Sequence, residues 1–483
     1  MQKGPMMKID KKILAVVIGL LICVNLIGLA AGVDQSTSPT VIDTEAENLE
    51  VTIYNADLGV VKEYRAKYLP AGVINVLYEG VASRIDPTSV RLKAVDSVIE
   101  VVEQNYQYDL VNRDKILKKY IDKDIVAYLT YGDKKEMIEG TLLSYEGDQL
   151  TIKDKEGMIQ IIDSNNLVLP ELPEGLITKP TLVWILNVTE SRNHTLELSY
   201  MSSGMTWNAD YVVVTSKNDS KLDLNGWVTV TNNAGTTFKN TSLKLVAGDV
   251  HRVRDEILYK TPYYMATPTP RAGQFEEEAL FEYHMYVLPR RTTLKNNEKK
   301  QISLLEATDI DVEKEYVYDD IRNWWYGDDW SDTGEKKVDV MLNFNNSAEN
   351  SLGIPLPKGT VRVFTNDKEG KLQFIGEDSI DHTPKDETIS LFIGHAFDIV
   401  GERTQMDFNE LANRYEYVWA VNFRNHKDED IVVTVLERTS GDWEITDENY
   451  NHTKVSNNEI EWQVPVKANG ESTLTYTIRY KRW

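Results

Sequence analysis

Residues 182–250 have the sequence LVWILNVTESRNHTLELSYMSSGMTWNADYVVVTSKNDSKLDLNGWVTVTNNAGTTFKNTSLKLVAGDV, in which apolar and polar residues alternate. Leu196, Leu198 and Tyr200 recur with the two-residue period of a strand that buries one face. The pattern continues at residues 211–215, 227–231 and 243–246. The breaks are Arg-Asn-His, Lys-Asn-Asp and Asn-Asn-Ala-Gly, residue types that tolerate turn geometry. The stretch therefore predicts the antiparallel core of a β-sandwich.

The N-terminus predicts export. Lys8, Lys11 and Lys12 precede an apolar run that ends at Ala30-Ala31-Gly32, small residues of the kind that a signal peptidase accepts. Residues 13–31 are also long enough to span a bilayer as a helix. Residues 1–32 are therefore predicted to be a signal peptide or an N-terminal membrane anchor, and the sequence leaves both open. In either case the body is expected outside the cell or on its surface.

The charge of the chain excludes one class of partner. The formal net charge is −23, and residues 1–32 carry +3 of it, so residues 33–483 carry −26 (−23 minus 3). A nucleic-acid partner would need a basic face, and none is expected. The only cysteine, Cys23, lies in the apolar N-terminal run. The body therefore has neither disulfides nor a thiol nucleophile, and buried cores must stabilise it.

The length of 483 residues predicts roughly three domains. Residues 113–120 place Ile116, Leu117 and Tyr120 on one helical face, and four short strands with tight turns follow. The expected fold class is all-β: two immunoglobulin-like, antiparallel β-sandwich domains with a small β-barrel insertion, preceded by the signal or anchor helix. The expected divisions are a linker (33–50), a first sandwich (51–104 plus 171–318), the inserted barrel (105–170), an aromatic-acidic loop (319–336) and a C-terminal sandwich (337–483).

Two phrases in the chain resemble each other. Residues 183–200, VWILNVTESRNHTLELSY, and residues 418–437, VWAVNFRNHKDEDIVVTVLE, each suggest a strand, an Arg-Asn-His turn and a second strand. A distant duplication and a turn shaped alike by chance both explain the resemblance, and we favour the second explanation.

The aromatic-acidic loop has the sequence DDIRNWWYGDDWSDTGEK. Exposed aromatic rings can stack on sugar rings while carboxylates accept hydroxyl hydrogen bonds. The candidate carbohydrate-binding residues are Trp324, Trp325, Tyr326 and Trp330. The alternative, which we favour, is a loop whose aromatic side chains fold back over a sheet edge or a domain junction.

The same loop suggests a calcium site at Asp328, Asp329 and Asp332. The pattern departs from an EF-hand because Trp330 takes the third ligand position and Thr333 takes the position of the turn glycine. The seven histidines are scattered and form no HExxH pair, so calcium is the one metal that the sequence suggests.

Six Asn-X-Ser/Thr sequences are candidate glycosylation sites if the organism has the machinery. They begin at Asn187, Asn193, Asn218, Asn240, Asn345 and Asn451.

Motifs of catalysis are lacking in the sequence. It contains no GxSxG elbow, no Walker loop and no GxGxxG. Paired carboxylates could still support hydrolysis, but 76 Asp and Glu residues make any chosen pair uninformative.

Several phrases resemble the family catalogued as domain of unknown function 4139. They are VTIYNADLGVVKEYRAKYLPAG, ASRIDPTSVRL, TLVWIL, LSYMSSGMTWNADYVV and LKLVAGDVHRV, followed by EYHMYVLPRRTTLKNNEKKQISLL and LQFIGEDSIDHTP. The resemblance covers residues 49–483 and implies a β-rich fold. It implies no established activity and no catalytic residues.

The leading hypothesis is a non-enzymatic structural or adhesive module of the cell envelope, whose partner is an envelope polysaccharide or protein. The first alternative is a carbohydrate-binding surface protein that uses the tryptophan-rich loop. The second is a hydrolase that uses carboxylates.

Overall fold

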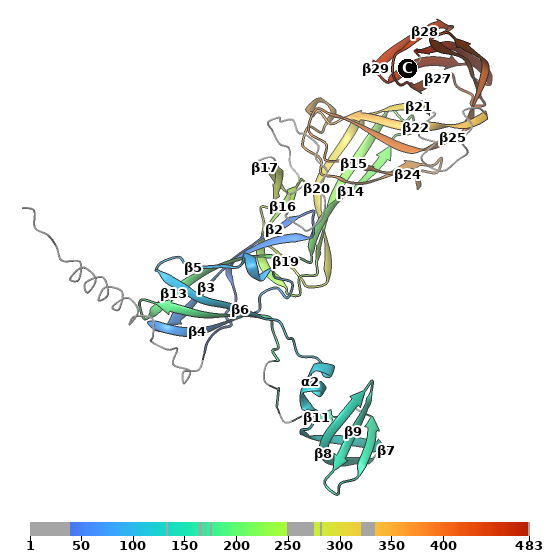
Figure 1. The fold of residues 1–483 in the computed structure, drawn as a ribbon. Helices are drawn as coiled ribbons and strands as arrows, with labels where there is room; N and C mark the ends of the chain where they lie inside the picture. The colour runs from blue at the N-terminus through green and yellow to red at the C-terminus, as the bar shows by residue number, and fades with distance from the viewer. Residues whose placement is uncertain are drawn as a thin grey trace, which may run out of the picture.

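The computed structural model describes residues 39–131, 134–163, 167–169, 171–173, 176–248, 275–280, 283–319 and 334–481. Strands dominate these residues, with one α-helix and the short 3-10 helices Pro87–Ser89 and Ala348–Asn350 (Figure 1). The all-β fold class is therefore confirmed. The predicted signal or anchor segment lies outside the described residues.

Two sheets form the N-terminal end of the fold. The first has the order β1-β4-β12-β6, with bounds Thr40–Ile42, Gly72–Glu79, Thr181–Val188 and Ile99–Gln107. The second has the order β17-β18-β16-β2-β3-β13-β5, with bounds Glu276–Leu280, Tyr283–Val287, Phe238–Ala247, Glu47–Tyr54, Leu58–Leu69, Arg192–Ser202 and Arg91–Ala94. The short β19, Thr292–Leu294, also pairs with β16.

A third sheet joins parts of the chain that lie far apart in sequence. Its order is β20-β15-β14-β23-β24, with bounds Glu298–Asp311, Lys221–Asn232, Met205–Thr215, Gly359–Asn366 and Leu372–Ile380. β14 and β23 pair in parallel, Thr215 opposite Thr365. Strands from beyond residue 337, the expected start of the C-terminal sandwich, therefore share a sheet with strands from before it.

The C-terminal sheet has nine strands in the order β28-β31-β26-β25-β22-β21-β27-β30-β29. Their bounds are Trp443–Glu448, Gly470–Lys481, Arg414–Asn425, Thr388–Leu411, Gly334–Asn345, Glu313–Asp319, Ile431–Arg438, Glu459–Val466 and His452–Ser456.

The inserted unit contains the expected helix and strands but no barrel. α2, Arg113–Tyr120, is capped by the Asn112 side chain and buries Leu117 and Tyr120. The sheet order is β10-β9-β8-β7-β11, with bounds Ile159–Asp163, Gln149–Asp154, Lys134–Glu146, Asp124–Tyr131 and Leu167–Val168. The two end strands, β10 and β11, are not paired with each other within the described residues, so the predicted barrel is wrong and the sheet is open. β11 has only two residues, too few to give the stagger that closure requires.

Burial divides the described side chains into three cores. The largest includes Trp184, Trp207 and Tyr211 and draws on the first three sheets. The second includes Trp462 and belongs to the C-terminal sheet, and the third includes Leu150 and belongs to the inserted unit. Side chains of β13, β14 and β15 alternate between buried and accessible positions. Strand alternation in residues 182–250 is therefore confirmed.

A buried asparagine closes the corner between β15 and β16. Asn232 is 1% exposed, and its Nδ2 donates to the carbonyl oxygens of Thr236, Leu294 and Lys295 at 3.0, 3.1 and 3.1 Å. Its Oδ1 accepts from the backbone N–H of Ala234 at 3.1 Å. One side chain therefore forms hydrogen bonds with backbone groups of two separate loops. Buried backbone groups beyond the end of a strand need such partners.

The corner between β26 and β27 repeats this arrangement. Asn425 is 1% exposed, and its Nδ2 donates to the carbonyl oxygens of Glu429 and Lys467 at 2.9 and 3.1 Å, with Val466 at 3.5 Å. Its Oδ1 accepts from the N–H of Lys427 at 3.0 Å. In both corners the asparagine Nδ2 donates to the carbonyl oxygen of the residue four positions later in the chain. It also donates to the carbonyl oxygens of two consecutive residues at the end of a neighbouring strand.

A third buried asparagine, Asn346, forms hydrogen bonds of the same kind at another corner. Its Nδ2 donates to the carbonyl oxygens of Ile354 and Pro384 at 2.7 and 2.8 Å, and its Oδ1 accepts from Gly353 N–H at 3.0 Å. Each turn that receives such an asparagine contains a residue in the left-handed region, namely Asn297 (φ 57°), Asp386 (φ 65°) and Asn469 (φ 50°). The short polar side chains of Asn and Asp tolerate this region best after glycine.

The two Arg-Asn-His sequences, in residues 183–200 and 418–437, lie at different positions relative to their strands. Arg192 and Asn193 open β13 and Asn193 is exposed, whereas Asn425 closes β26 and is buried. The two similar corners instead follow β15 and β26, and each of these strands pairs antiparallel with a strand further along the chain, β20 and β31. The phrase similarity was therefore not a structural one.

Replacing Asn425 with alanine should leave several buried carbonyl groups and one N–H without partners. We expect Asn425→Ala to lower the free energy of unfolding by about 2–3 kcal/mol. The matched control is Asn422→Ala on the same strand, whose Oδ1 accepts from Thr473 at an exposed position. It should change stability by less than about 1 kcal/mol. Urea unfolding followed by tryptophan fluorescence compares them, and equal losses would contradict the assigned role.

Candidate functional site

Most of the sequence-predicted site residues lie outside the described residues. This holds for the candidate carbohydrate-binding residues Trp324, Trp325, Tyr326 and Trp330 and for the candidate calcium ligands Asp328, Asp329 and Asp332. Where the structure describes the chain, no group of three or more His, Cys, Asp and Glu side chains is placed to hold a metal ion. Nor does any helix of that part have the length and apolar character needed to cross a bilayer.

The six candidate glycosylation residues are all described, and their exposure differs. Asn187 is half-buried in β12 and donates to Glu100 at 3.2 Å. The others are exposed, namely Asn193, Asn218, Asn240, Asn345 and Asn451. Exposure is what a glycan acceptor needs, and all six asparagines stay predictions.

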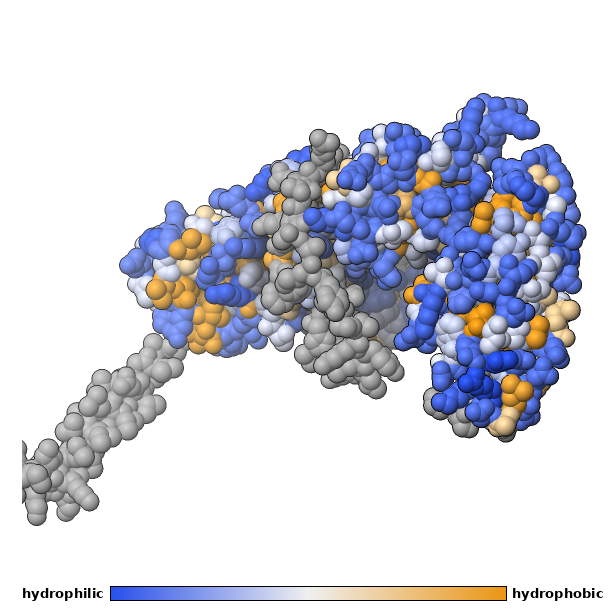
Figure 2. All heavy atoms as spheres, turned by 90° about the horizontal axis from the view of Figure 1, so that it is seen from above, coloured by the Kyte–Doolittle hydropathy of each residue, from blue (hydrophilic) through white to orange (hydrophobic). Residues whose placement is uncertain are grey.

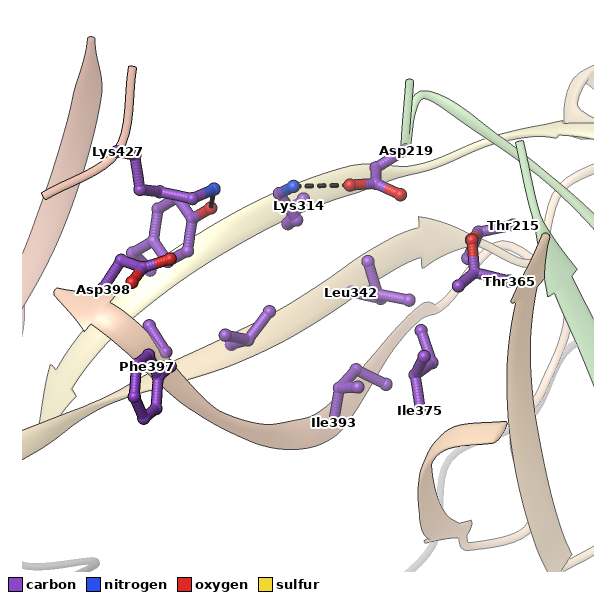
Figure 3. A pocket seen from close by; sticks show the side chains of 13 residues that line it. Thr215, Asp219, Lys314, Leu342, Thr365, Ile375, Ile393, Phe397, Asp398 and Lys427 are labelled. Atoms are coloured by element: carbon purple, nitrogen blue, oxygen red, sulfur yellow. Dashed lines mark hydrogen bonds and ion pairs between the residues drawn. The ribbon is translucent and has the colours of Figure 1, made fainter. Parts of the chain in front are cut away.

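The face of the molecule seen in Figure 2 is mostly hydrophilic, with small and separate apolar patches among the described residues. The site that we single out is a groove of about 260 Å³ where the third sheet meets the C-terminal sheet, hereafter the junction groove (Figure 3). Its lining residues are Thr215, Asp219, Lys314, Tyr316, Val340, Leu342, Thr365, Ile375, Ile393, Ala396, Phe397, Asp398 and Lys427.

β-bulges form the apolar wall of the junction groove. Ile375 is an extra residue in β24, because its neighbours pair with consecutive residues of β23. Ile393 is an extra residue in β25 for the same reason, opposite β22. Residues 396–399 have no partners in β22, although Ile399 pairs with Asn425 of β26, and Phe397 among them is 96% exposed. Bulges re-aim side chains and are frequent beside functional sites.

A glycine follows each bulged isoleucine. A Cβ on Gly376 would lie 2.4 Å from the carbonyl oxygen of Ile393, so only glycine lets β24 approach β25 this closely. Gly394 has φ +150°. The tripeptide Phe-Ile-Gly therefore occurs twice, at residues 374–376 and 392–394, with the same local consequence.

The Asn425 corner supplies the other end of the junction groove. Because Asn425 holds the N–H of Lys427, the loop after β26 turns the Lys427 side chain towards Tyr316. The N–H of His426 donates to the Asp398 carbonyl oxygen at 2.8 Å, which ties this loop to the bulge in β25.

Charged groups of both signs line the opposite wall. Lys314 Nζ lies 2.5 Å from Asp219 Oδ2. Lys427 Nζ lies 2.7 Å from the Tyr316 hydroxyl and 2.7 Å from Glu429 Oε1. Figure 3 shows Lys427, Lys314 and Asp219 along one side of the groove, facing the aliphatic side chains on the other.

These contacts keep the groups ionised. Burial lowers the pKa of Lys314, but the hydrogen bond to Asp219 and the attraction of Tyr316 outweigh it, so the pKa is raised. For Lys427, burial is likewise outweighed by the contacts with Glu429 and Tyr316, and its pKa is raised. The hydrogen bond from Lys427 lowers the pKa of Glu429.

Thr215 closes one end of the junction groove. It is 2% exposed, and its Oγ1 has no hydrogen-bond partner among the described residues. A buried hydroxyl without a partner costs free energy and is rare in native structures. Thr365, its neighbour across the β14–β23 pair, lines the same end.

Two other charged clusters belong to the cores. Arg65 Nη2 lies 2.9 Å from Glu63 Oε1, which also accepts from Tyr78 at 2.8 Å. Arg403 and Glu437 form a similar buried pair at 3.0 Å in the C-terminal sheet. Both arginines stack on aromatic rings, so these pairs are packed among buried side chains and do not line the groove.

Comparison of the chain with models of known protein families and with curated proteins finds no match. Only the geometry of the structure therefore supports the junction groove as a functional site. Sequence reasoning missed every groove residue because they are spread from Thr215 to Lys427. The repeated Phe-Ile-Gly was the one available signal, since an isolated glycine in a strand suggests a bulge.

Removing the Lys427 ammonium should raise the pKa of Glu429 towards its ordinary value of 4.5. Because the folded pKa is the lowered one, the stabilisation by this pair is present above pH 4.5 and is lost as the pH falls through the folded pKa. The difference in free energy of unfolding between wild type and Lys427→Met should therefore become smaller as the pH falls below 4.5. Carboxyl ¹³C shifts measure the pKa directly.

The control for this titration is Lys467→Met in the same corner. Lys467 pairs with Asp430 at 2.6 Å, so this variant should raise the pKa of Asp430 and leave Glu429 unchanged. If Glu429 titrates alike in wild type and in Lys427→Met, the pairing does not govern its charge.

Proposed function

We propose that this chain is an exported, non-enzymatic protein of the cell surface, a structural or adhesive module that holds its ligand in the junction groove. Several sheets in series supply the rigid body that such a module needs, and the groove supplies a concave, partly apolar site.

The observation that carries the proposal is the geometry of the groove, in which Asp219 holds Lys314 and Tyr316 and Glu429 hold Lys427 opposite an apolar wall. The pKa values of Lys314 and Lys427 are raised and that of Glu429 is lowered, so all three stay charged near neutral pH. A group that transfers protons in catalysis works best with a pKa near the operating pH. These groups are therefore suited to binding and orienting a ligand.

Residues 1–32 are proposed to export the chain and, if retained, to anchor it through residues 13–31. Membership of the family of domain of unknown function 4139 is proposed on the phrases given above. Glycosylation of the five exposed asparagines is compatible with a position outside the cell.

The proposal predicts that the protein binds envelope polysaccharide and does not cleave it. Full-length protein incubated with envelope polysaccharide of the producing organism should co-sediment with it, while the concentration of reducing ends stays at the level of the protein-free sample. Boiled protein is the control for non-specific adsorption. Release of reducing ends above that level would favour the carboxylate hydrolase and overturn the non-enzymatic assignment.

The tryptophan-rich segment offers a second binding site on sequence grounds. Replacing Trp324, Trp325 and Trp330 together with alanine should abolish retention on polysaccharide without lowering the melting temperature if this segment binds. A lower melting temperature with unchanged retention would show that the aromatic residues are structural.

A further inference from the structure

We propose that the junction groove binds a sugar ring, with Phe397 and the bulged isoleucines against its apolar face and the lysine–carboxylate wall against its hydroxyl groups. The inference rests on the proposed function and names the ligand class of the same site.

The groove is small. Its volume of about 260 Å³ lies just below the range of roughly 300–1,000 Å³ typical of sites for drug-sized ligands. One sugar ring is a ligand of suitable size, and the open side lets the remainder of a glycan continue into solvent.

The polar wall carries charges of both signs, and Glu429 pairs with Lys427 just outside the lining. Its lining includes the ammonium groups of Lys314 and Lys427 and the carboxylates of Asp219 and Asp398. A ligand with a net charge of either sign would meet repulsion from half of these groups. Hydroxyl groups both donate and accept, so a polyhydroxylated neutral ligand fits such a wall best.

The lysines keep hydrogen-bonding capacity for a ligand. An ammonium group has three N–H donors, and Lys314 uses one of them on Asp219 among the described residues. Because Asp219 fixes the position of that ammonium, a hydroxyl group would meet a donor that is already oriented, which lowers the entropy loss on binding.

The apolar side of the groove matches the carbon face of a sugar. Phe397 is 96% exposed at the mouth, although the chain buries most of its large apolar side chains. The bulge at residues 396–399 places Phe397 on the same side of the groove as Ile375 and Ile393 (Figure 3). An exposed aromatic ring at the mouth of a groove is suited to stack on a flat, weakly polar surface.

Thr215 gives an independent sign of a ligand. The residue lines the groove, and its hydroxyl is buried and lacks a partner in the described part of the chain. Because this oxygen is buried, a rotation of the Thr215 side chain would bring it to the groove, where a ligand hydroxyl would supply the missing hydrogen bond and an aliphatic ligand would not.

The test is saturation-transfer NMR of full-length protein with the methyl glycosides of glucose, galactose and mannose and with N-acetylglucosamine, each at millimolar concentration. Sodium octanoate and the dipeptide Ala-Ala are tested beside them as an aliphatic anion and a zwitterion. We expect saturation of at least one sugar. Phe397→Ala and Thr215→Val should each weaken its binding roughly three- to tenfold.

Two measurements separate loss of the site from loss of the fold. Thr215→Val preserves shape and removes only the unpartnered hydroxyl, so its melting temperature should stay equal or rise. Phe374→Ala is the matched control, because Phe374 is 58% exposed on β24 but packs against Phe364 and does not line the groove. It should bind the sugar as wild type does.

Three results would overturn the inference: no sugar is saturated, the sugar signal is unchanged in both groove variants, or octanoate or Ala-Ala binds in the groove in place of every sugar. If polysaccharide retention is unchanged in the same variants, the adhesive function stands and only the assignment of the groove fails. If retention is also absent from wild type, the proposed function fails with it.

Discussion

At every corner of a stacked β-sheet, some backbone N–H and C=O groups lose their partners in the strand ladder and cannot reach water. They need hydrogen bonds from another part of the protein. In this protein Asn232, Asn346 and Asn425 meet that constraint. Each amide side chain contacts two loops, so it both satisfies carbonyl oxygens and fixes which strands lie beside each other. The positions of the strands around each corner follow from these contacts, and so does the position of the junction groove.

The groove shows how a regular scaffold acquires a specific surface. Strand pairing alone would direct the side chains of β24 and β25 to the two faces in alternation. Extra residues at Ile375 and Ile393 break that alternation, and the close approach at Gly376 holds the two strands together there. The Asn425 corner then sets Lys427 across from them. Backbone irregularities and one buried amide therefore produce the site, without a change in the overall architecture.

Two-residue alternation was sufficient to predict the strands of residues 182–250 and the all-β class, because it records which side chains are buried. The helix at residues 113–120 was predictable from its apolar face. Closure of the inserted sheet was not, because it depends on stagger between strands. The parallel pairing of β14 with β23 joins residues about 150 positions apart, which no local pattern records. The groove was hidden for the same reason, since Thr215 and Lys427 line one groove only after the third sheet and the C-terminal sheet have formed.

The inserted unit leaves and rejoins the fold at neighbouring points. Gln107, the last residue of β6, is paired with Thr181, the first residue of β12, so the two ends of residues 108–180 are one strand spacing apart, about 4.8 Å. Just beyond, Leu110 and Ile177 form a bridge that keeps the outgoing and returning chains together (Figure 1). A tight turn could span the same gap. The unit thus stands in the place of a hairpin turn between β6 and β12, and the pairing of these two strands does not depend on its size or fold.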